Sequence, residues 1–260
     1  MKKKKAFTLI ELLIVIAVIA ILLTLLVPAL SQARRQARAA VCIATLKSWG
    51  MAYQLYAEDH KGKLPEFVPG TVHSTNFMEN LRDYYSDINN MRICPEAKVV
   101  STENNTGYQA LSFFGDTFNA WQVDPTALFV ADDDWGKGSY GENSWIRKYT
   151  TTPEKPYYIT RCWSKIDAKG EARTDEIPLL MDARWNNFWP EDTDDPAGVQ
   201  SYCTGNWAEM AAVVMRRHND GINMCFMDAS VRQVSAEELW NLRWHRKFKR
   251  QGRVDLSWLK

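Results

Sequence analysis

Hydrophobic residues are concentrated near the start of the chain. Residues 7–30 contain one charged side chain, Glu11, and apart from Thr8, Thr24 and Pro28 the other positions are aliphatic or aromatic. A helix of this length measures about 36 Å at 1.5 Å per residue, which is enough to cross a bilayer core of roughly 30 Å. The pattern therefore predicts a transmembrane helix over residues 7–30.

The helical pattern continues beyond this segment, because small and aromatic residues recur every three to five positions, close to one helix face. These residues are Ala33, Ala37, Val41, Ala44, Trp49, Ala52, Tyr53 and Tyr56. Gly62 and Pro65 then end the pattern. Residues 31–62 are predicted to be an amphipathic continuation of the helix. Pro28 should kink the rod or melt it locally, and a helix end at Pro28 is an equally good interpretation.

Residues 63–260 have the pattern of short strands and loops, punctuated by Gly, Pro, Asn and Asp. A hairpin is predicted to join 211–216 to 222–227, with a third strand over 231–234. A capping box at 235–238 then starts a final helix. The sequence predicts an α+β fold in which the long N-terminal helix packs on an antiparallel-sheet head.

Charge gives an orientation. Lysines at positions 2 to 5 precede the apolar segment, so the positive-inside rule places the N-terminus in the cytoplasm and the head outside. Arg34, Arg35 and Arg38, just beyond the segment, reduce this asymmetry. The whole chain has 32 basic and 31 acidic residues, without the basic excess of a nucleic-acid binder, so no nucleic-acid partner is expected.

Glu11 is unusual because an acid at mid-membrane costs roughly 2.5–3.5 kcal/mol, although its place near the start of the segment lowers this cost. If the chain were cut before Phe7, the new α-amino group of a neighbouring copy could neutralise Glu11. A carboxylate that remains in the headgroup region is the simpler alternative. A secretory signal peptide ending at residues 29–31 is another, but its apolar core is usually only 7 to 15 residues long.

Residues 5–13, Lys-Ala-Phe-Thr-Leu-Ile-Glu-Leu-Leu, resemble the class III signal of type IV pilins and type II secretion pseudopilins. The resemblance implies a pilin-like fold and a leader over residues 1–6. It also implies cleavage by prepilin peptidase between Ala6 and Phe7, methylation of Phe7, and a role for Glu11 in assembly. The family normally has Gly where this chain has Ala6. Loss of the leader would change the net charge from +1 to −3, because it removes four lysines.

The C-terminal part is similar to the H-x9-D-G signature of large pseudopilin-like proteins, carried here by His218 and Asp228. Ala229 stands where that signature has Gly. Further stretches fit the same group: Cys42 with Leu46 and Lys47; Tyr56, Asp59, Gly62 and Pro65; Cys94 and Pro95; Ser139 to Gly141 with Asn143; and Pro178 to Asp182.

Five cysteines, at 42, 94, 162, 203 and 225, would meet an oxidising compartment if the head is exported. None forms a C-x-x-C pair, which argues against a zinc ribbon or a thioredoxin motif. We predict a disulfide between Cys42 and Cys94 that fastens the stalk to the head. Cys225 is predicted to be a lone thiol, since it is out of phase with the apolar positions of its strand.

Two acidic runs, at 132–134 and 191–195, could bind calcium, but neither matches a calcium-binding loop, so solvated turn acids are favoured. No other cofactor is expected. His218 is predicted to be a turn histidine bonded to the backbone, because no hydrolase motif accompanies it. Tryptophans in the predicted loops could stack on sugars, although core packing is favoured. They are Trp135, Trp145, Trp163, Trp185, Trp189 and Trp207.

These features predict a non-enzymatic filament subunit of a pilus or a type II secretion pseudopilus. It would be a single-pass protein of the bacterial inner membrane with its head in the periplasm or outside the cell. Its expected partners are copies of itself, other pseudopilins, prepilin peptidase and the membrane. The alternative is a monomeric membrane-anchored module that binds glycans, and an anchored hydrolase ranks third.

Overall fold

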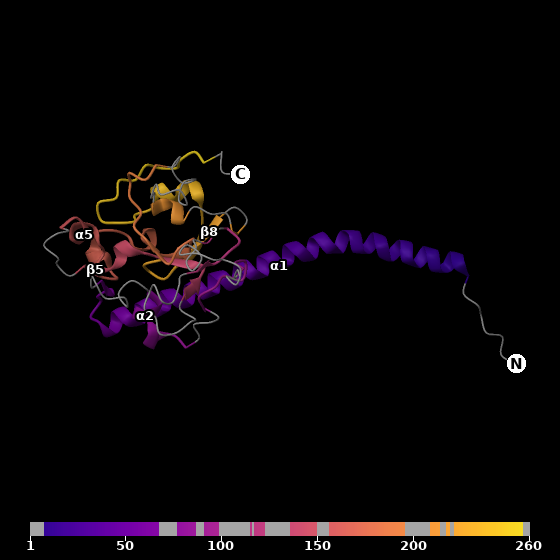
Figure 1. Cartoon of the computed structure of the whole chain (residues 1–260), viewed down its shortest axis with the longest axis horizontal. Helices are drawn as coiled ribbons and strands as arrows, with labels where there is room; N and C mark the ends of the chain where they lie inside the picture. The colour runs from indigo at the N-terminus through magenta and orange to yellow at the C-terminus, as the bar shows by residue number, and fades with distance from the viewer. Residues whose placement is uncertain are drawn as a thin grey trace, which may run out of the picture.

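The computed structural model describes residues 8–67, 77–86, 91–98, 115, 117–122, 136–149, 156–195, 209–213, 217–218 and 221–256. A single helix, α1 (Leu9–Asp59), dominates the shape. Its 51 residues correspond to about 77 Å of rod. Figure 1 shows this rod leaving the head on one side and curving gently toward its N-terminal end. The long helix and the sheet described below form the predicted α+β, pilin-like layout.

Local signals set both ends of α1. Thr8 is its N-cap and forms a capping box with Glu11, and His60 caps the other end, two residues before Gly62 with its positive φ of 77°. Pro28 lies inside α1. The interpretation of Pro28 as a helix end is therefore wrong. A proline removes one backbone hydrogen bond from a helix, and the hydrogen bonds of the turns on either side keep α1 continuous.

The two halves of α1 have different surroundings. Its apolar N-terminal part is long and hydropathic enough to span a membrane and is not buried against the rest of the chain. Burial begins only at Cys42 and follows one face, through Leu46, Trp49, Gly50, Ala52, Tyr53 and Ala57. Val41 and Ala44, predicted on the head-facing side, are exposed instead. Apolar residues occur on both sides of the helix in this region, so periodicity alone could not choose the buried face.

The head is built on one five-stranded sheet with the order β7-β4-β6-β8-β9. Its strands are β4 (Tyr140–Asn143), β6 (Pro178–Asp182), β7 (Asn187–Phe188), β8 (Gly221–Phe226) and β9 (Val231–Ser235). All neighbours pair antiparallel except β4 and β7, which are parallel. Strand β6 is central, and Tyr140 of β4 pairs with Asp182 at its end. The sheet is therefore mixed but mainly antiparallel.

Short elements surround this sheet. Strands β1 (Glu66–Phe67) and β5 (Lys148–Tyr149) pair in parallel, and β2 (Trp121–Gln122) pairs antiparallel with β3 (Lys137–Gly138). The α-helices of the head are α2 (Phe77–Asn80) and α5 (Pro156–Arg161). The 3-10 turns are η2 (Arg82–Tyr84), η4 (Ser144–Ile146), η5 (Ala168–Gly170), η6 (Thr174–Glu176), η8 (Glu209–Ala212) and η9 (Ala236–Asn241).

The predicted hairpin is partly wrong. Residues 211 and 212 belong to the 3-10 turn η8, and β8 pairs with β6 and β9. The tight turn of this region joins β8 to β9, because Ala229 adopts a left-handed backbone with a φ of 62°. The third strand is confirmed, and so is the capping box between Ser235 and Glu238, although the helix that it starts is 3-10.

The sheet separates two hydrophobic cores. One lies between the sheet and α1 and contains Trp49, Tyr53 and Cys225. The other lies on the opposite face and contains Ile222, Met224 and Phe226, with Trp240 and Trp244 from the C-terminal segment. Cys225 is thus out of phase with the apolar positions of β8, as predicted, and it is a free thiol packed toward the stalk.

Candidate functional site

The N-terminal processing site is only partly described. Ala6 and Phe7 lie outside the described residues. Glu11 lies in the first turn of α1, where its carboxylate accepts hydrogen bonds from the Thr8 amide at 2.9 Å and the Thr8 hydroxyl at 2.8 Å. The Glu11 amide in turn donates to the Thr8 hydroxyl at 3.2 Å. In the single chain, therefore, the start of the helix itself satisfies the Glu11 carboxylate.

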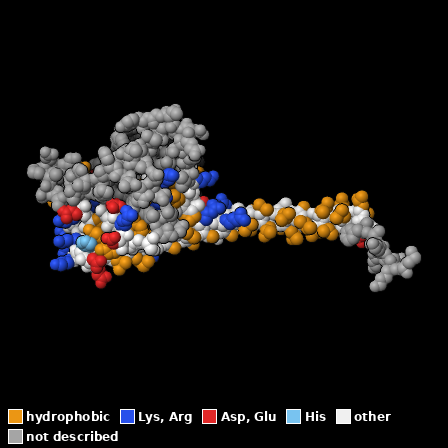
Figure 2. Space-filling model, turned by 60° about the horizontal axis from the view of Figure 1, so that its bottom comes forward, with side chains coloured by type: hydrophobic (Ala, Val, Ile, Leu, Met, Phe, Trp, Pro, Cys, Tyr) orange, Lys and Arg blue, Asp and Glu red, His pale blue; other side chains and the backbone are white. Residues whose placement is uncertain are grey.

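Apolar side chains surround Glu11 and are exposed in the single chain. Leu9 is 80% exposed and Leu25 is 70% exposed, and the large side chains between them are also exposed. Figure 2 shows hydrophobic side chains along the rod outside the head and basic ones where the rod meets it. Arg34, Arg35 and Arg38 are exposed there. This surface fits lipid tails or the helices of neighbouring subunits.

A buried cluster lies where the stalk enters the head. It consists of Cys42 from α1, Cys94 from the loop 91–98, Asp182 at the end of β6, and His218 just before β8. One Sγ, N or O atom from each of the four lies within 4.8 Å of the others, and all four residues are buried. Cys94 Sγ is 3.3 Å from His218 Nε2, which is 3.2 Å from Asp182 Oδ2. Chain segments distant in sequence thus meet at one point.

Two basic groups balance the acids of this cluster. Arg217 donates to Asp182 at 3.0 Å, and both side chains are fully buried. Burial works against the charge on Asp182, but the hydrogen bond with His218 and the charge of Arg217 hold its pKa below the usual value. Burial likewise opposes a charged His218, yet hydrogen bonds with Asp182 and Cys94 raise the pKa of its imidazole to about 9.

The two thiols differ in acidity. A hydrogen bond from Cys42, reinforced by His218, lowers the pKa of Cys94 to about 6 against the effect of its burial. Burial raises the pKa of Cys42 well above the usual value. At neutral pH the cluster therefore contains a Cys94 thiolate, which is the form of cysteine that binds metals and reacts as a nucleophile.

The two cysteines of the predicted Cys42–Cys94 disulfide lie close together, with their sulphur atoms within 4.8 Å of each other. Both residues are free thiols in this structure, so the disulfide stays a prediction. The prediction for His218 is wrong, because its side chain contacts Cys94 and Asp182 and not the backbone. It lies at a turn, as expected, but its imidazole faces the buried Cys94 and Asp182.

Asp228 has a different role from His218. It is exposed in the turn between β8 and β9 and accepts a hydrogen bond from the Ser230 amide at 2.9 Å. The stretch between His218 and Asp228 contains the whole of β8, so the two residues lie beyond opposite ends of this strand. The sequence analysis assigned no role to Asp182, although this acid ends the stretch 178–182 that fits the pseudopilin-like group.

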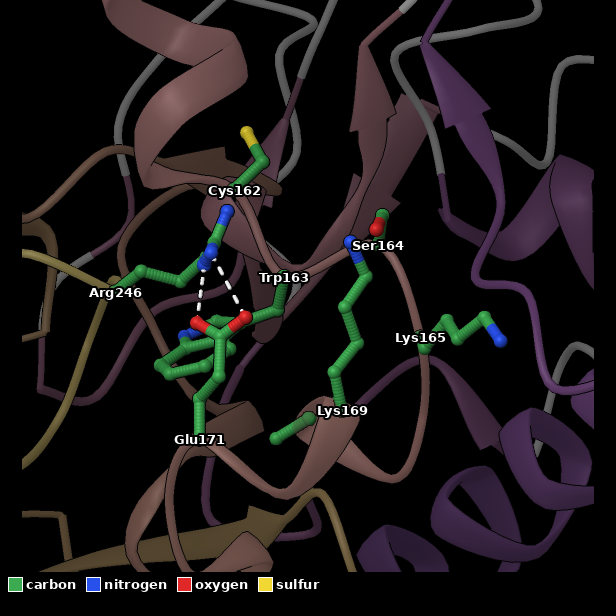
Figure 3. Close-up of a pocket in the computed structure, with 8 residues that line it drawn as sticks. Cys162, Trp163, Ser164, Lys165, Lys169, Glu171 and Arg246 are labelled. Atoms are coloured by element: carbon green, nitrogen blue, oxygen red, sulfur yellow. Dashed lines mark hydrogen bonds and ion pairs between the residues drawn. The ribbon is translucent and has the colours of Figure 1, made fainter.

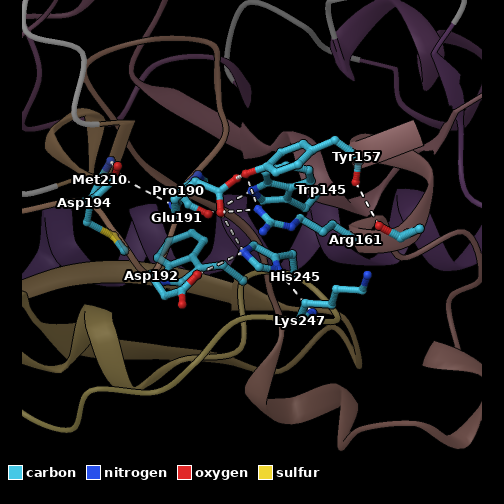
Figure 4. Close-up of polar contacts among 12 residues, drawn as sticks. Trp145, Tyr157, Arg161, Pro190, Glu191, Asp192, Asp194, Met210, His245 and Lys247 are labelled. Carbon is cyan, nitrogen blue, oxygen red and sulfur yellow. Dashed lines mark hydrogen bonds and ion pairs between the residues drawn. The ribbon is translucent and has the colours of Figure 1, made fainter. Parts of the chain in front are cut away.

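The second acidic run is built into the head. Figure 4 shows Glu191 at the centre of polar contacts with Arg161, Tyr157 and His245. Arg161 donates to Glu191 at 2.7 Å, and His245 Nε2 lies 3.0 Å from it. Asp194 accepts backbone N–H groups from Glu191 and Met210. These two acids are therefore partly buried and paired, and not simply solvated. Calcium binding here stays a prediction, and residues 132–134 lie outside the described residues.

A narrow hollow beside Cys162 offers no sign of an activated nucleophile. Glu171, at its edge, accepts two hydrogen bonds from Arg246, at 2.6 and 2.8 Å. Figure 3 shows the Cys162 sulphur pointing away from this ion pair. Burial raises the pKa of Cys162 to about 12, so the thiol stays protonated and unreactive. These contacts stabilise the fold and give no support to a hydrolase.

The described tryptophans pack inside the head, as favoured by the sequence analysis. Trp145 and Trp163 are buried, and Trp185 and Trp189 are half-buried against neighbouring rings. Trp135 and Trp207 lie outside the described residues. A sugar-binding platform needs exposed rings. No described tryptophan provides one, so the glycan-binding alternative has no support in this part of the chain.

Comparison with known proteins identifies the N-terminal segment. A family model described as the prokaryotic N-terminal methylation motif matches residues 1–27. Comparisons with curated proteins and with solved structures gave no significant match. Pilin-type proteins with this motif are structural substrates of prepilin peptidase, and the one apolar helix fits a protein anchored in the inner membrane. The motif and the long apolar helix together support a type IV pilin-like protein.

Proposed function

We propose that the chain is a structural, non-enzymatic subunit of a type IV pilus-like filament or a type II secretion pseudopilus. Prepilin peptidase cuts it before Phe7, and the mature subunit assembles through the N-terminal half of α1. The observation that carries this proposal is the methylation motif over residues 1–27, followed directly by a long, unburied apolar helix.

The apolar surface of α1 has to stay out of water at every stage of assembly. Burying one large aliphatic side chain is worth about 1.5–3 kcal/mol, and the segment from Leu9 to Leu30 presents many of them. Lipid covers this surface before assembly. In a filament the same surface packs against the corresponding helices of neighbouring subunits, so that the subunit leaves the membrane without exposing it to water.

Glu11 supplies the register between subunits. Its carboxylate is bonded only to Thr8 of its own chain among the described residues, at the exposed tip of the helix. After cleavage, the α-amino group of Phe7 in a neighbouring subunit can approach this carboxylate. The pair is then buried among helices, where an unpaired charge would be strongly destabilising. Subunits that are out of register leave both charges unpaired.

Orientation follows from the charges on either side of the membrane segment. The lysines at positions 2 to 5 hold the N-terminus in the cytoplasm, where prepilin peptidase removes them, and the head lies in the periplasm or outside the cell. Three basic residues then lie at the base of the head, where the inner membrane meets water on its non-cytoplasmic side. They are Arg34, Arg35 and Arg38.

Glu11→Ala tests assembly directly. The full chain is co-expressed with a prepilin peptidase and its pilus or secretion assembly proteins, and filaments are collected by shearing and viewed by electron microscopy. Loss of the buried charge pair costs about 3–5 kcal/mol per subunit contact, so we expect filaments to disappear while membrane insertion persists. Glu58→Ala, an exposed change on the same helix, is the matched control and should assemble normally.

N-terminal sequencing of the membrane-extracted protein tests processing. A mature chain that begins with methylated Phe7 is expected. An intact Met1 would rule out processing, and a start at Gln32 would identify a secretory signal peptide. If Glu11→Ala assembled as well as the unchanged chain, the role of Glu11 would be wrong.

A further inference from the structure

We propose that Cys42, Cys94, Asp182 and His218 form a structural zinc site that locks the stalk helix to the head. The site goes beyond the filament role, because it concerns how a single subunit is held together. Its ligands come from four separate segments: α1, the loop 91–98, the end of β6 and His218, three positions before the start of β8. A metal at their meeting point ties all four together.

The donor set is one that zinc prefers. Zinc in structural sites is bound by four ligands in a tetrahedron, chosen from thiolate sulphur, imidazole nitrogen and carboxylate oxygen. With bonds of about 2.0–2.3 Å, the edges of such a tetrahedron measure roughly 3.3–3.8 Å. The four side chains therefore offer the right atoms, and their separations can be compared with these edges.

Three of the six distances between the donor atoms are close to the edges of such a tetrahedron. Cys94 Sγ lies 3.3 Å from His218 Nε2, and Nε2 lies 3.2 Å from Asp182 Oδ2. Cys42 Sγ lies 3.7 Å from the same oxygen. All four donor atoms are within 4.8 Å of one another. A zinc ion can therefore bind between them once the side chains adjust to bring the remaining pairs of donor atoms closer together.

Charge also balances around a zinc ion. The two thiolates and Asp182 carry three negative charges, and Zn²⁺ with Arg217 carries three positive ones, while His218 binds as a neutral ligand. The guanidinium of Arg217 lies 3.0 Å from Asp182 Oδ1, on the other oxygen of the carboxylate. A neutral cluster avoids the large cost of burying a net charge.

Neighbouring groups hold the ligands in place. The Tyr140 hydroxyl donates to Cys42 Sγ at 3.4 Å, and the backbone N–H of Asn223 donates to Asp182 Oδ2 at 3.2 Å. A cavity of about 40 Å³ adjoins the cluster and is lined by Arg35, Ala39, Glu96, Arg217, His218 and Gln233. Its lining includes both the exposed Arg35 and the buried His218.

A disulfide between Cys42 and Cys94 is the competing state of the same thiols. It would explain the two cysteines but not why a histidine and an acid lie beside them, fully or almost fully buried. A zinc ion explains all four residues. The two states exclude each other, because the sulphur atoms of a disulfide cannot bind zinc as thiolates.

Metal analysis of the full chain tests the site. The protein is extracted in detergent without chelator, and its zinc is measured by elemental mass spectrometry. About one zinc per chain is expected. The zinc is then replaced with cobalt, and the intense visible absorption of tetrahedral cobalt bound to thiolates is expected. A chain that contains no zinc and gives no such cobalt spectrum after reduction would overturn the proposal.

Variants locate the metal. Cys94→Ser should abolish the cobalt spectrum, whereas Cys225→Ser, which changes a buried thiol outside the cluster, should retain it. Since Cys94→Ser could fail to fold, Tyr140→Phe provides a milder test. Removing its hydrogen bond to Cys42 should weaken metal affinity about 10–100-fold while the near-UV circular dichroism is unchanged. Unaltered affinity in both variants would place the metal elsewhere and refute this site.

The disulfide has its own signature. Mass spectrometry of the native protein under non-reducing conditions distinguishes a Cys42–Cys94 bridge from two free thiols. A bridge in the exported protein would overturn the zinc site and confirm the disulfide. Neither result depends on filament assembly, so failure of the zinc site and failure of the proposed function are distinguishable.

Discussion

Tyr53, on the stalk helix, donates its hydroxyl proton to the carboxylate of Glu142, which is completely buried in β4. The other oxygen of that carboxylate accepts from Arg147 Nε at 2.6 Å. Burial and the negative charge of Glu142 raise the pKa of Tyr53 well above its usual value, so the phenol keeps its proton. The stalk therefore contributes a hydrogen-bond donor to a charge pair inside the head.

This contact predicts different costs for two substitutions. Glu142→Gln removes the negative charge that faces the buried Arg147 guanidinium and should lower the free energy of unfolding by about 3–5 kcal/mol. Tyr53→Phe removes one hydrogen bond and should cost about 1–2 kcal/mol. Urea unfolding of the detergent-solubilised chain, followed by tryptophan fluorescence, measures both.

A surface ion pair provides the control for this comparison. Glu176→Gln breaks the contact with Arg250, which is partly exposed, and should change the free energy by no more than about 1 kcal/mol. Equal losses for Glu142→Gln and Glu176→Gln would contradict a structural role for the buried pair.

Gly50 is predicted to tolerate no side chain, because α1 lies directly on the sheet there. A Cβ at this position would lie 2.6 Å from Cys225 Sγ and 3.0 Å from the Ala229 Cβ. Gly50→Ala should therefore destabilise the chain by about 1–2 kcal/mol, although alanine is the better helix former.

A double variant tests this cause. Cys225→Ala removes the sulphur that the new methyl group would meet. In the pair Gly50→Ala and Cys225→Ala, the loss should be smaller than the sum of the two single losses by about 0.5 kcal/mol or more. Strict additivity in thermal unfolding would show that the two positions do not contact each other.

Ala229 is predicted to be strained. Its φ of 62° is in the left-handed region. Alanine adopts this region at an energetic cost, whereas glycine adopts it without one. Ala229→Gly should raise the free energy of unfolding by about 0.5–1 kcal/mol. Ala183→Gly, at a buried position with no positive φ, should lower it instead. A loss of stability in Ala229→Gly would mean that the packing of its methyl group outweighs the strain.

Asp194 should give part of the pH dependence of stability. Burial raises its pKa to about 6, although backbone amides bonded to it oppose this effect. The folded chain therefore binds this proton more tightly than the unfolded chain, where the pKa is about 3.9. Asp194 then destabilises the head at pH 7, and this penalty disappears as the pH falls from about 6 to about 4.

Asp194→Asn isolates this contribution. The free energy of unfolding of the variant should exceed that of the unchanged chain most at pH 7. This difference should shrink by about 1–3 kcal/mol by pH 4.5. Urea unfolding at both pH values measures the difference. Asp195→Asn controls for the loss of one negative charge from the same loop. A difference independent of pH would rule out a raised pKa at Asp194.

Some features were predictable because they depend on near neighbours in sequence. The apolar run, the N-cap at Thr8, the glycine after the stalk and the capping box at Ser235 all act within one or two helical turns. The buried side of the stalk was less predictable. Val41 and Cys42 are adjacent and both apolar, and only contact with the sheet decides that Cys42 is buried.

The sequence by itself determined that the N-terminal part forms a membrane-length helix with an acid in its first turn, because length, hydropathy and capping need no tertiary context. Only the tertiary structure decided that Cys42, Cys94, Asp182 and His218 meet. Their meeting depends on the strand order that places β6 beside β8, and on the seating of α1 across both. Contacts between distant segments come from packing a whole core, and no local pattern specifies them.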